Sequence, residues 1–179
     1  MNLETFTETE LLRLAHQLDS RALAQVYDQY SPELYRYAMR LLGNPTIAED
    51  CVSETFSRFL QALSAQKGPR DYLRAYLYRI AHNWITDQYR RERPSEELDE
   101  SLPDKANAPE QTADLHAQNA ALQQAIRKLT PDQRQVIALK FWHDWENEEI
   151  ARALHKPVGA VKSLQHRALN ALERYLQDQ

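Results

Sequence analysis

The chain has 179 residues and a net charge of −4, which suits one domain of ordinary size or two smaller ones. Its single cysteine, Cys51, excludes an intramolecular disulfide and a cysteine-cluster metal site, and is typical of a reducing compartment. A redox sensor is one interpretation of Cys51, but a small buried side chain is favoured within an apolar helical segment. Without a leader or an apolar run of ~20 residues, we expect a cytoplasmic protein.

The sequence predicts an all-α fold, because it has only three glycines, prolines at segment ends and no alternating β-branched runs. In chain order, helix starts are predicted at capping boxes or caps: Thr7 with Glu10, Asp19-Ser20, and Thr46 with Glu49. Ser31-Pro32 is expected to restart or kink the second helix, and Gly43-Asn44-Pro45 to end the next apolar stripe. A loop over 64–70 then precedes a long helix over 71–93.

The helix over 71–93 combines basic, amide and aromatic side chains. Its core face is predicted to hold Leu73, Leu77, Ile80 and Trp84, which leaves Arg79, Asn83, Thr86, Arg90 and Arg93 outward. Arginines contact phosphates, and amides and aromatic rings suit bases that have left the stack. The helix is therefore a candidate nucleic-acid surface, although core packing is the simpler explanation for any single aromatic.

The next segment is predicted to be an acidic linker between two domains. Residues 94–119 carry one basic and seven acidic side chains, whereas residues 1–93 are neutral and residues 120–179 have a net charge of +2. Residues 94–114 contain too little apolar surface to fold alone, so we expect this stretch to be mobile in the free protein. The predicted organisation is a domain over 1–93, a linker over 94–119 and a domain over 120–179.

The last fifty residues favour a helix-turn-helix. A capping box at Thr130 and Gln133 starts one helix, and a short helix ends at His155-Lys156-Pro157. The final helix has an inward stripe and an opposite polar face that carries Lys162, Gln165, His166 and Arg167; the stripe is Val161, Leu164, Ala168, Ala171 or Leu172, and Tyr175. This arrangement places a helix in the major groove, although a three-helix bundle with a solvated face is the alternative.

These segments together resemble one protein family. The motifs EEIARAL, PVGAVKS and HRALNAL are similar to region 4 of the extracytoplasmic-function sigma factors, the small two-domain sigma-70 proteins that direct bacterial RNA polymerase to promoters. The stretches over 34–63 and 73–94 resemble region 2 of the same family. The resemblance implies two small helical domains joined by the acidic linker, one for each region.

The resemblance also implies three sets of site residues. Region 2 would recognise and melt the minus-ten element, capturing a base in a pocket shaped by the loop over 65–70, with Lys67, Arg70, Arg79, His82, Asn83, Gln88, Arg90, Arg91 and Arg93 on DNA. Region 4 would contact the minus-thirty-five element through Lys156, Lys162, Ser163, Gln165, His166 and Arg167. The match AEDCVSETFSRFLQ implies docking on polymerase through Glu49, Asp50, Ser53, Glu54, Ser57 and Gln61, where a merely solvated helix face is the local alternative.

The implied partners are promoter DNA, an anti-sigma factor, and core RNA polymerase through its β′ clamp coiled coil and β flap. The linker would thread the basic cavity where RNA is made, or serve only as a disordered, solubilising segment. No catalytic set, cofactor motif or metal spacing is present, so we expect neither an enzyme nor a cofactor.

The chain departs from the family pattern near the second domain's recognition helix. Asp144 and Glu146 replace the usual Gly and Ser, Ala160 replaces a Thr, and Leu164-Gln165 replaces Arg-Leu. We therefore expect altered or weak contact with the upstream element. A sigma-like regulator or partner-binding module without full promoter function is the alternative.

Overall fold

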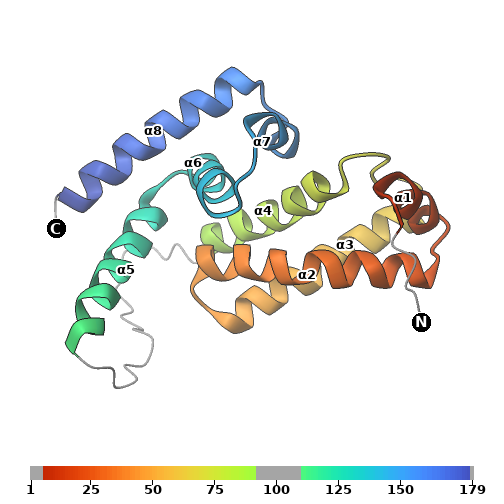
Figure 1. The fold of residues 1–179 in the computed structure, drawn as a ribbon, viewed down its shortest axis with the longest axis horizontal. Helices are drawn as coiled ribbons and strands as arrows, with labels where there is room; N and C mark the ends of the chain where they lie inside the picture. The colour runs from red at the N-terminus through yellow and green to blue at the C-terminus, as the bar shows by residue number, and fades with distance from the viewer. Residues whose placement is uncertain (1–5, 92–109, 178–179) are drawn as a thin grey trace.

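The structure is a computed structural model that describes residues 6–91 and 110–177. Within these ranges the regular elements are all helical, as the sequence predicts, and they form two bundles that pack against each other (Figure 1). The N-terminal bundle contains α1 (Glu8–His16), α2 (Ser20–Leu42), α3 (Pro45–Ser64) and α4 (Leu73–Arg91). The C-terminal bundle contains α5 (Glu110–Lys128), α6 (Pro131–Ile137), the π-helical turn η1 (Ala138–Trp142), α7 (Asn147–Leu154) and α8 (Val158–Gln177).

Side-chain caps begin the first three helices. Thr7 accepts a hydrogen bond from the Glu10 amide, and Asp19 accepts from two amides at 3.0 Å, as predicted. The predicted cap at Thr46 is wrong: α3 begins two residues earlier, where Asn44 accepts from the Ile47 amide at 3.1 Å. Pro45 then occupies the first helical position, where its missing N–H costs no hydrogen bond, so the Asn-Pro pair outcompetes the later threonine.

The long helix α2 continues through Pro32, so the predicted restart does not occur. It ends at Gly43, whose φ of 68° is the left-handed conformation that glycine adopts readily. Large buried side chains from α2, α3 and α4 form the core; they include Leu34, Tyr37, Leu41, Phe59, Leu63, Leu73 and Leu77. Ile80 and Trp84, predicted for this core, pack against it while half-buried.

Cys51 is fully buried in α3, as expected. Burial raises the pKa of its thiol to about 12, despite a hydrogen-bonding Thr55 hydroxyl and the Arg58 charge, which both lower it. A thiol that is neutral and out of solvent is a poor nucleophile. The structure therefore disfavours the redox-sensor interpretation.

The helix α5 changes the boundary of the predicted linker. It begins at Glu110, so residues 110–119 are helical, and the rest of the predicted linker lies outside the described residues. The sequence from 113 onward is rich in alanine, glutamine and leucine, which have high helix propensity, and this outweighs the acidic character of the preceding stretch. None of the described helices combines the length and hydropathy needed to cross a membrane.

Arg134 fastens α5 to α6. Its guanidinium is almost wholly buried and donates to the carbonyls of Ile126, Arg127 and Leu129 at 2.9–3.1 Å. These carbonyls belong to the end of α5 and the turn after it, where no following helical amide is available to donate to them. The predicted capping box of Thr130 and Gln133 is present: each residue's backbone amide donates to the other's side chain. The turn between α5 and α6 is therefore held by Arg134 on one side and by this capping box on the other.

We predict that Arg134→Met lowers the free energy of unfolding by roughly 3 kcal/mol, because methionine keeps much of the volume but leaves buried carbonyls without donors. Urea denaturation followed by circular dichroism measures the change. Arg174→Met is the matched control, since Arg174 is exposed on α8. Equal unfolding midpoints for the two variants would contradict the role given to Arg134.

Candidate nucleic-acid interface

The helix α4 carries most of the side chains predicted to contact DNA. Asn83, Arg90 and Arg91 are exposed, Arg79 and Gln88 are half-buried, and Arg93 lies outside the described residues. The Arg79 guanidinium lies 5.1 Å from the centre of the Tyr76 ring, and Arg90 pairs with Asp87 at 3.6 Å. The helix therefore presents basic groups beside an amide and an aromatic ring, which are the groups that contact phosphates and unstacked bases.

His82 is the exception among these candidates, because it is 9% exposed and faces the C-terminal bundle. Its Nε2 lies 3.3 Å from the Thr86 hydroxyl, and its Nδ1 is buried without a hydrogen-bond partner. His82 is thus buried in this structure, and its contact with DNA stays a prediction. Helical periodicity places His82 beside the outward Asn83 and Thr86, but it cannot show that a second bundle covers that face.

The short loop before α4 is firmly held. The His16 Nε2 lies 2.9 Å from the carbonyl of Pro69, and a Cβ added at Gly68 would come within 2.6 Å of Leu63. Glycine is thus the residue that fits this close approach. The anchored loop leaves Lys67 and Arg70, two of the predicted DNA contacts, exposed at its edges.

The helices α7 and α8 form the predicted helix-turn-helix. The Glu149 carboxylate accepts from the Glu146 amide at 3.0 Å, which settles how α7 begins despite its unusual sequence. His155, at φ 51°, ends α7 in the left-handed conformation, and α8 starts three residues later. The helix α8 buries Val161, Leu164, Ala168, Ala171 and Leu172, as its periodicity predicts.

The opposite face of α8 carries the predicted recognition side chains. Lys162, Ser163, His166 and Arg167 are exposed there. Gln165 is half-buried and donates to the Asn147 side chain at 2.7 Å, so it holds α8 against α7. Lys156, from the turn, pairs with Asp132 at 3.0 Å. The structure thus keeps four of the six predicted side chains together on one open face and uses the other two for contacts within the C-terminal bundle.

The outer face of α3 carries the predicted docking residues. Glu49, Asp50, Ser53, Ser57 and Gln61 are exposed, and Glu54 is half-buried in an ion pair with Arg58 at 2.7 Å. Two large apolar side chains, Leu60 of α3 and Tyr27 of α2, are also 41% and 50% exposed. This face therefore offers a partner both exposed apolar side chains and negative charge.

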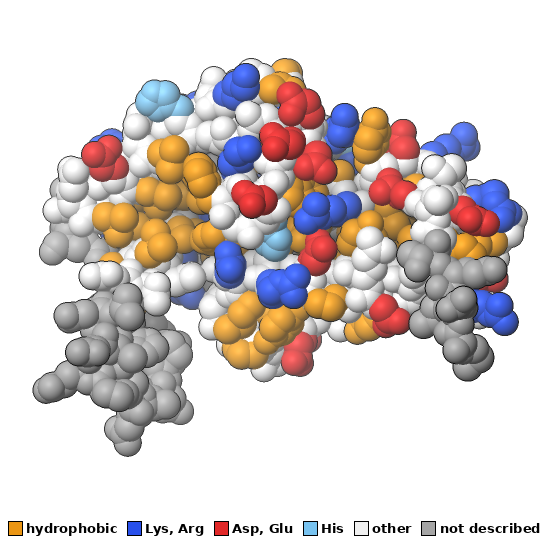
Figure 2. Space-filling view, in the orientation of Figure 1, with side chains coloured by type: hydrophobic (Ala, Val, Ile, Leu, Met, Phe, Trp, Pro, Cys, Tyr) orange, Lys and Arg blue, Asp and Glu red, His pale blue; other side chains and the backbone are white. Residues whose placement is uncertain are grey.

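A second apolar surface lies on the C-terminal bundle. Figure 2 shows hydrophobic side chains gathered between α5, α6 and α8. The large exposed apolar residues on these helices are Leu122, Leu169 and Leu176.

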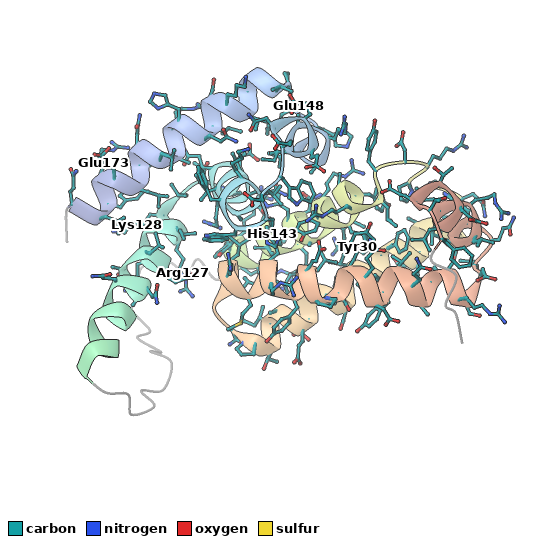
Figure 3. The ribbon with its side chains drawn as sticks, viewed as in Figure 1. Tyr30, Arg127, Lys128, His143, Glu148 and Glu173 are labelled. Carbon is teal, nitrogen blue, oxygen red and sulfur yellow. The ribbon has the colours of Figure 1, made fainter. Side chains whose placement is uncertain are left out.

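The two bundles meet through an aromatic group that we name the interdomain cluster: Tyr37, Tyr78, His143 and Trp145. The Tyr78 ring centre lies 5.1 Å from Tyr37, 5.5 Å from His143 and 4.9 Å from Trp145. The His143 Nδ1 also lies 3.3 Å from the Tyr78 hydroxyl. Figure 3 shows His143 between the C-terminal bundle and the helices α2 and α4.

Arginine side chains surround this cluster. Arg74 of α4 lies 4.7 Å from the Trp145 ring centre, and Arg40 of α2 lies 5.5 Å from Trp142. We call the whole contact between the two bundles the seam. Further along it, the Arg134 guanidinium of α6 lies 3.7 Å from the centre of the Tyr89 ring of α4. Sequence analysis missed this interface because aromatic periodicity indicates burial without indicating which bundle supplies the covering surface.

Burial lowers the pKa of both histidines at the seam to about 4. For His82 the nearby Asp132 opposes the shift, while Arg134 and Lys156 add to it. For His143 the charges of Arg40, Arg74 and Arg36 add to the effect of burial. Both rings are therefore neutral near pH 7.

Comparison with known proteins now identifies the family. Sigma-70 region 2 matches residues 26–94, and Sigma-70 region 4 matches residues 119–172. The ECF RNA polymerase sigma factor SigL of Mycobacterium tuberculosis is 32% identical, over 89% of this chain and 92% of SigL. The chain belongs to the extracytoplasmic-function sigma factors.

Two further relatives agree with this assignment. The ECF RNA polymerase sigma factor BldN of Streptomyces coelicolor is 34% identical over 94% of this chain, which spans 66% of BldN. A solved structure of CnrH in complex with the cytosolic domain of CnrY matches with a TM-score of 0.70 and 25% identity, over 94% of this chain and 96% of CnrH. This sigma factor therefore shares the two-domain helical fold of its relatives.

The buried histidines predict how stability depends on pH. In the unfolded chain, His82 and His143 bind protons below about pH 6.5. In the folded chain, the same two side chains bind protons only near pH 4. The contribution of these two neutral histidines to the free energy of unfolding is thus at its maximum above pH 6.5 and falls as the pH drops toward 4. The slope is at most about 1.4 kcal/mol per pH unit for His82, and smaller for the half-buried His143.

Thermal unfolding between pH 7.5 and 4.5 tests this dependence. We expect His82→Gln and His143→Gln each to flatten the profile, and His166→Gln, on the exposed face of α8, to leave it unchanged. A steep profile that survives in the double variant would place the titrating groups elsewhere.

Proposed function

We propose that this sigma factor binds core RNA polymerase and directs it to promoters, with α4 acting on the minus-ten element and α8 on the minus-thirty-five element. The observation that carries the proposal is the pairing of two surfaces in one chain. The region 2 helix presents Arg79, Asn83 and Arg90, and the region 4 helix-turn-helix presents a separate polar face. Because polymerase works in the cytoplasm, we place the protein there.

The downstream element is proposed to depend on α4 and the loop before it. The loop is anchored at Pro69 and carries Lys67 and Arg70 at the surface. An anchored loop beside an amide-bearing helix is suited to hold a base that has left the duplex, since positioning costs little entropy when the site is rigid. Arg90 and Arg91 extend the basic surface toward the end of α4, where they would contact phosphates.

The upstream element is proposed to contribute less. Leu164 points into the core and is 8% exposed, and Ala160 has no polar group to offer. The half-buried Gln165 is occupied by Asn147. Lys162 and Arg167 are therefore left as the main cations of the recognition face, and we propose that they mainly contact phosphates, which fix the position of the helix without reading the sequence.

Two surfaces are proposed to contact polymerase. The outer face of α3, with Asp50 and Glu54, would dock on the β′ clamp coiled coil, because it is accessible and mixes acidic and apolar groups. The apolar surface between α5 and α8 would receive the β flap, since Leu122, Leu169 and Leu176 are exposed without apolar cover. We also propose a protein inhibitor of the anti-sigma type, supported by the likeness to CnrH, which was solved with the cytosolic domain of CnrY.

We predict that Asp50→Lys with Glu54→Lys weakens binding to core polymerase by tenfold or more, with unchanged helical content. Fluorescence anisotropy of the labelled protein titrated with core polymerase measures it. The Glu54 change also breaks the 2.7 Å pair with Arg58, so Arg58→Ala is the matched control for loss of the pair alone. Unchanged affinity in the double reversal would rule out α3 as the docking helix.

Promoter recognition should divide unequally between the helices. We predict that Asn83→Ala or Arg90→Ala severely impairs open-complex formation. Lys162→Ala with Arg167→Ala should instead lower the slope of log affinity against log salt concentration by about two, with little loss of discrimination between promoter sequences. Permanganate footprinting on a cognate promoter, with either element scrambled, measures both effects. Asp87→Ala controls for loss of the ion pair with Arg90. The proposed division would be wrong if the Asn83 and Arg90 variants still opened the promoter while scrambling the upstream element abolished opening.

A further inference from the structure

We propose that the cavity between the loop before α4 and the helix α7 binds a nucleoside diphosphate or triphosphate. Tyrosine rings would hold the base, and cations from both bundles would hold the phosphates. The inference goes beyond promoter recognition, because it gives the protein a small-molecule ligand. The two side chains on which the test depends, Tyr72 and Arg152, are assigned to neither DNA nor polymerase.

The cavity has the size of a small-molecule site. Its volume is about 810 Å³, and it lies where α7 packs against α4 (Figure 1). Sites for small ligands commonly have volumes of about 300–1,000 Å³. The buried side chains that line it, Pro69, Ala75 and Ala151, are small. They leave open a space that larger residues would fill.

Four cations from separate segments line this cavity. Lys67 comes from the loop, Arg79 from α4, Arg152 from α7, and Lys156 from the turn after α7. Among the described residues, only Lys156 of these four forms an ion pair, with Asp132 at 3.0 Å. Cations that are brought together without carboxylate partners repel one another, and an anion placed between them relieves the repulsion. The cavity therefore favours a ligand with several negative charges.

Two tyrosine rings accompany these cations. Tyr72 is 49% exposed, and its ring centre lies 4.3 Å from the Arg152 guanidinium. Tyr76 is half-buried, and its ring centre lies 5.1 Å from the Arg79 guanidinium. Nucleobases stack on aromatic rings and on guanidinium planes. Each ring thus offers a place for a base beside a cation for a phosphate, a combination that inorganic phosphate would use only in part.

Two carboxylates complete the lining. Asp71 of the loop and Glu148 of α7 are exposed, and neither belongs to an ion pair within the part of the chain that the structure describes. Figure 3 shows Glu148 on α7. An ionised carboxylate only accepts hydrogen bonds, so these groups suit ribose hydroxyls or amino groups of a base rather than phosphates. All three parts of a nucleotide therefore find matching groups in one cavity.

Titration of fluorescent methylanthraniloyl-GDP with the full chain measures binding. We expect a dissociation constant below about 1 mM. Tyr72→Ala with Arg152→Ala should weaken binding at least tenfold, because stacking and one phosphate contact are lost together. Tyr27→Ala with Arg174→Ala is the matched control, since it removes a tyrosine that is 50% exposed and an exposed arginine, both outside the cavity. Absence of binding, or unchanged affinity in the cavity variant with its helical content intact, would overturn the proposal.

Competition shows whether base and phosphates are both used. We expect unlabelled GDP to displace the fluorescent probe, and guanosine and inorganic pyrophosphate each to be at least tenfold weaker competitors, since each supplies only one half of the ligand. Displacement by pyrophosphate as effective as by GDP would mean a simple anion site and overturn the nucleotide proposal. Displacement by guanosine as effective as by GDP would overturn the role given to the cations.

Photolabelling locates the site in the unmodified protein. After irradiation with a photoreactive azido-GTP, we expect mass spectrometry to find labelled peptides from both 67–79 and 148–158, because residues of both segments line the cavity. An excess of GDP should abolish this labelling. Labelling that is confined to other segments, or that persists in excess GDP, would overturn the proposal.

Discussion

The guanidinium of Arg134 is the contact on which the arrangement of the two halves depends. It closes the carbonyl end of α5 and, on its other side, lies 3.7 Å from the Tyr89 ring centre of α4. Tyr89 in turn donates to the Leu41 carbonyl at the end of α2. One buried cation of α6 thus links α5, α4 and, through Tyr89, α2. Burial lowers its pKa, yet an arginine remains charged in proteins, so its donors are always available to the carbonyls.

The seam differs in chemistry from the cores on either side. Each core is closed by aliphatic and aromatic side chains such as Leu34, Phe59 and Val136, whose burial is favourable without any partner. The seam instead combines rings with hydroxyl, imidazole, amide and indole groups, several of them unpaired. Burial of such groups offsets part of the gain from ring contact. Burial where the bundles meet therefore contributes less stability than equal burial within either core.

The sequence predicted most of the helices, because apolar periodicity and local caps are encoded within a few residues. Asp19 and Thr130 act as expected, and α8 buries the predicted stripe. Two predictions failed where competing local signals coexist: Asn44 displaced Thr46 as a cap, and helix propensity extended α5 into the acidic segment. The burial of His82 was beyond local reasoning altogether, since it depends on a bundle 50 residues further along the chain. Tertiary contacts of that separation leave no periodic trace in a single sequence.

The charge distribution limits where this protein can attract DNA. The whole chain carries a net charge of −4, so its long-range field repels a polyanion, and attraction to DNA must come from local basic surfaces. When Arg79 and Lys156 line a pocket that also holds Asp132, part of that local field is neutralised within the protein. Non-specific DNA binding is dominated by phosphate contacts, so hiding these cations suppresses it most strongly. Attraction to a polyanion therefore depends on the basic groups that stay exposed, among them Arg90 and Arg91 of α4 and Lys162 of α8.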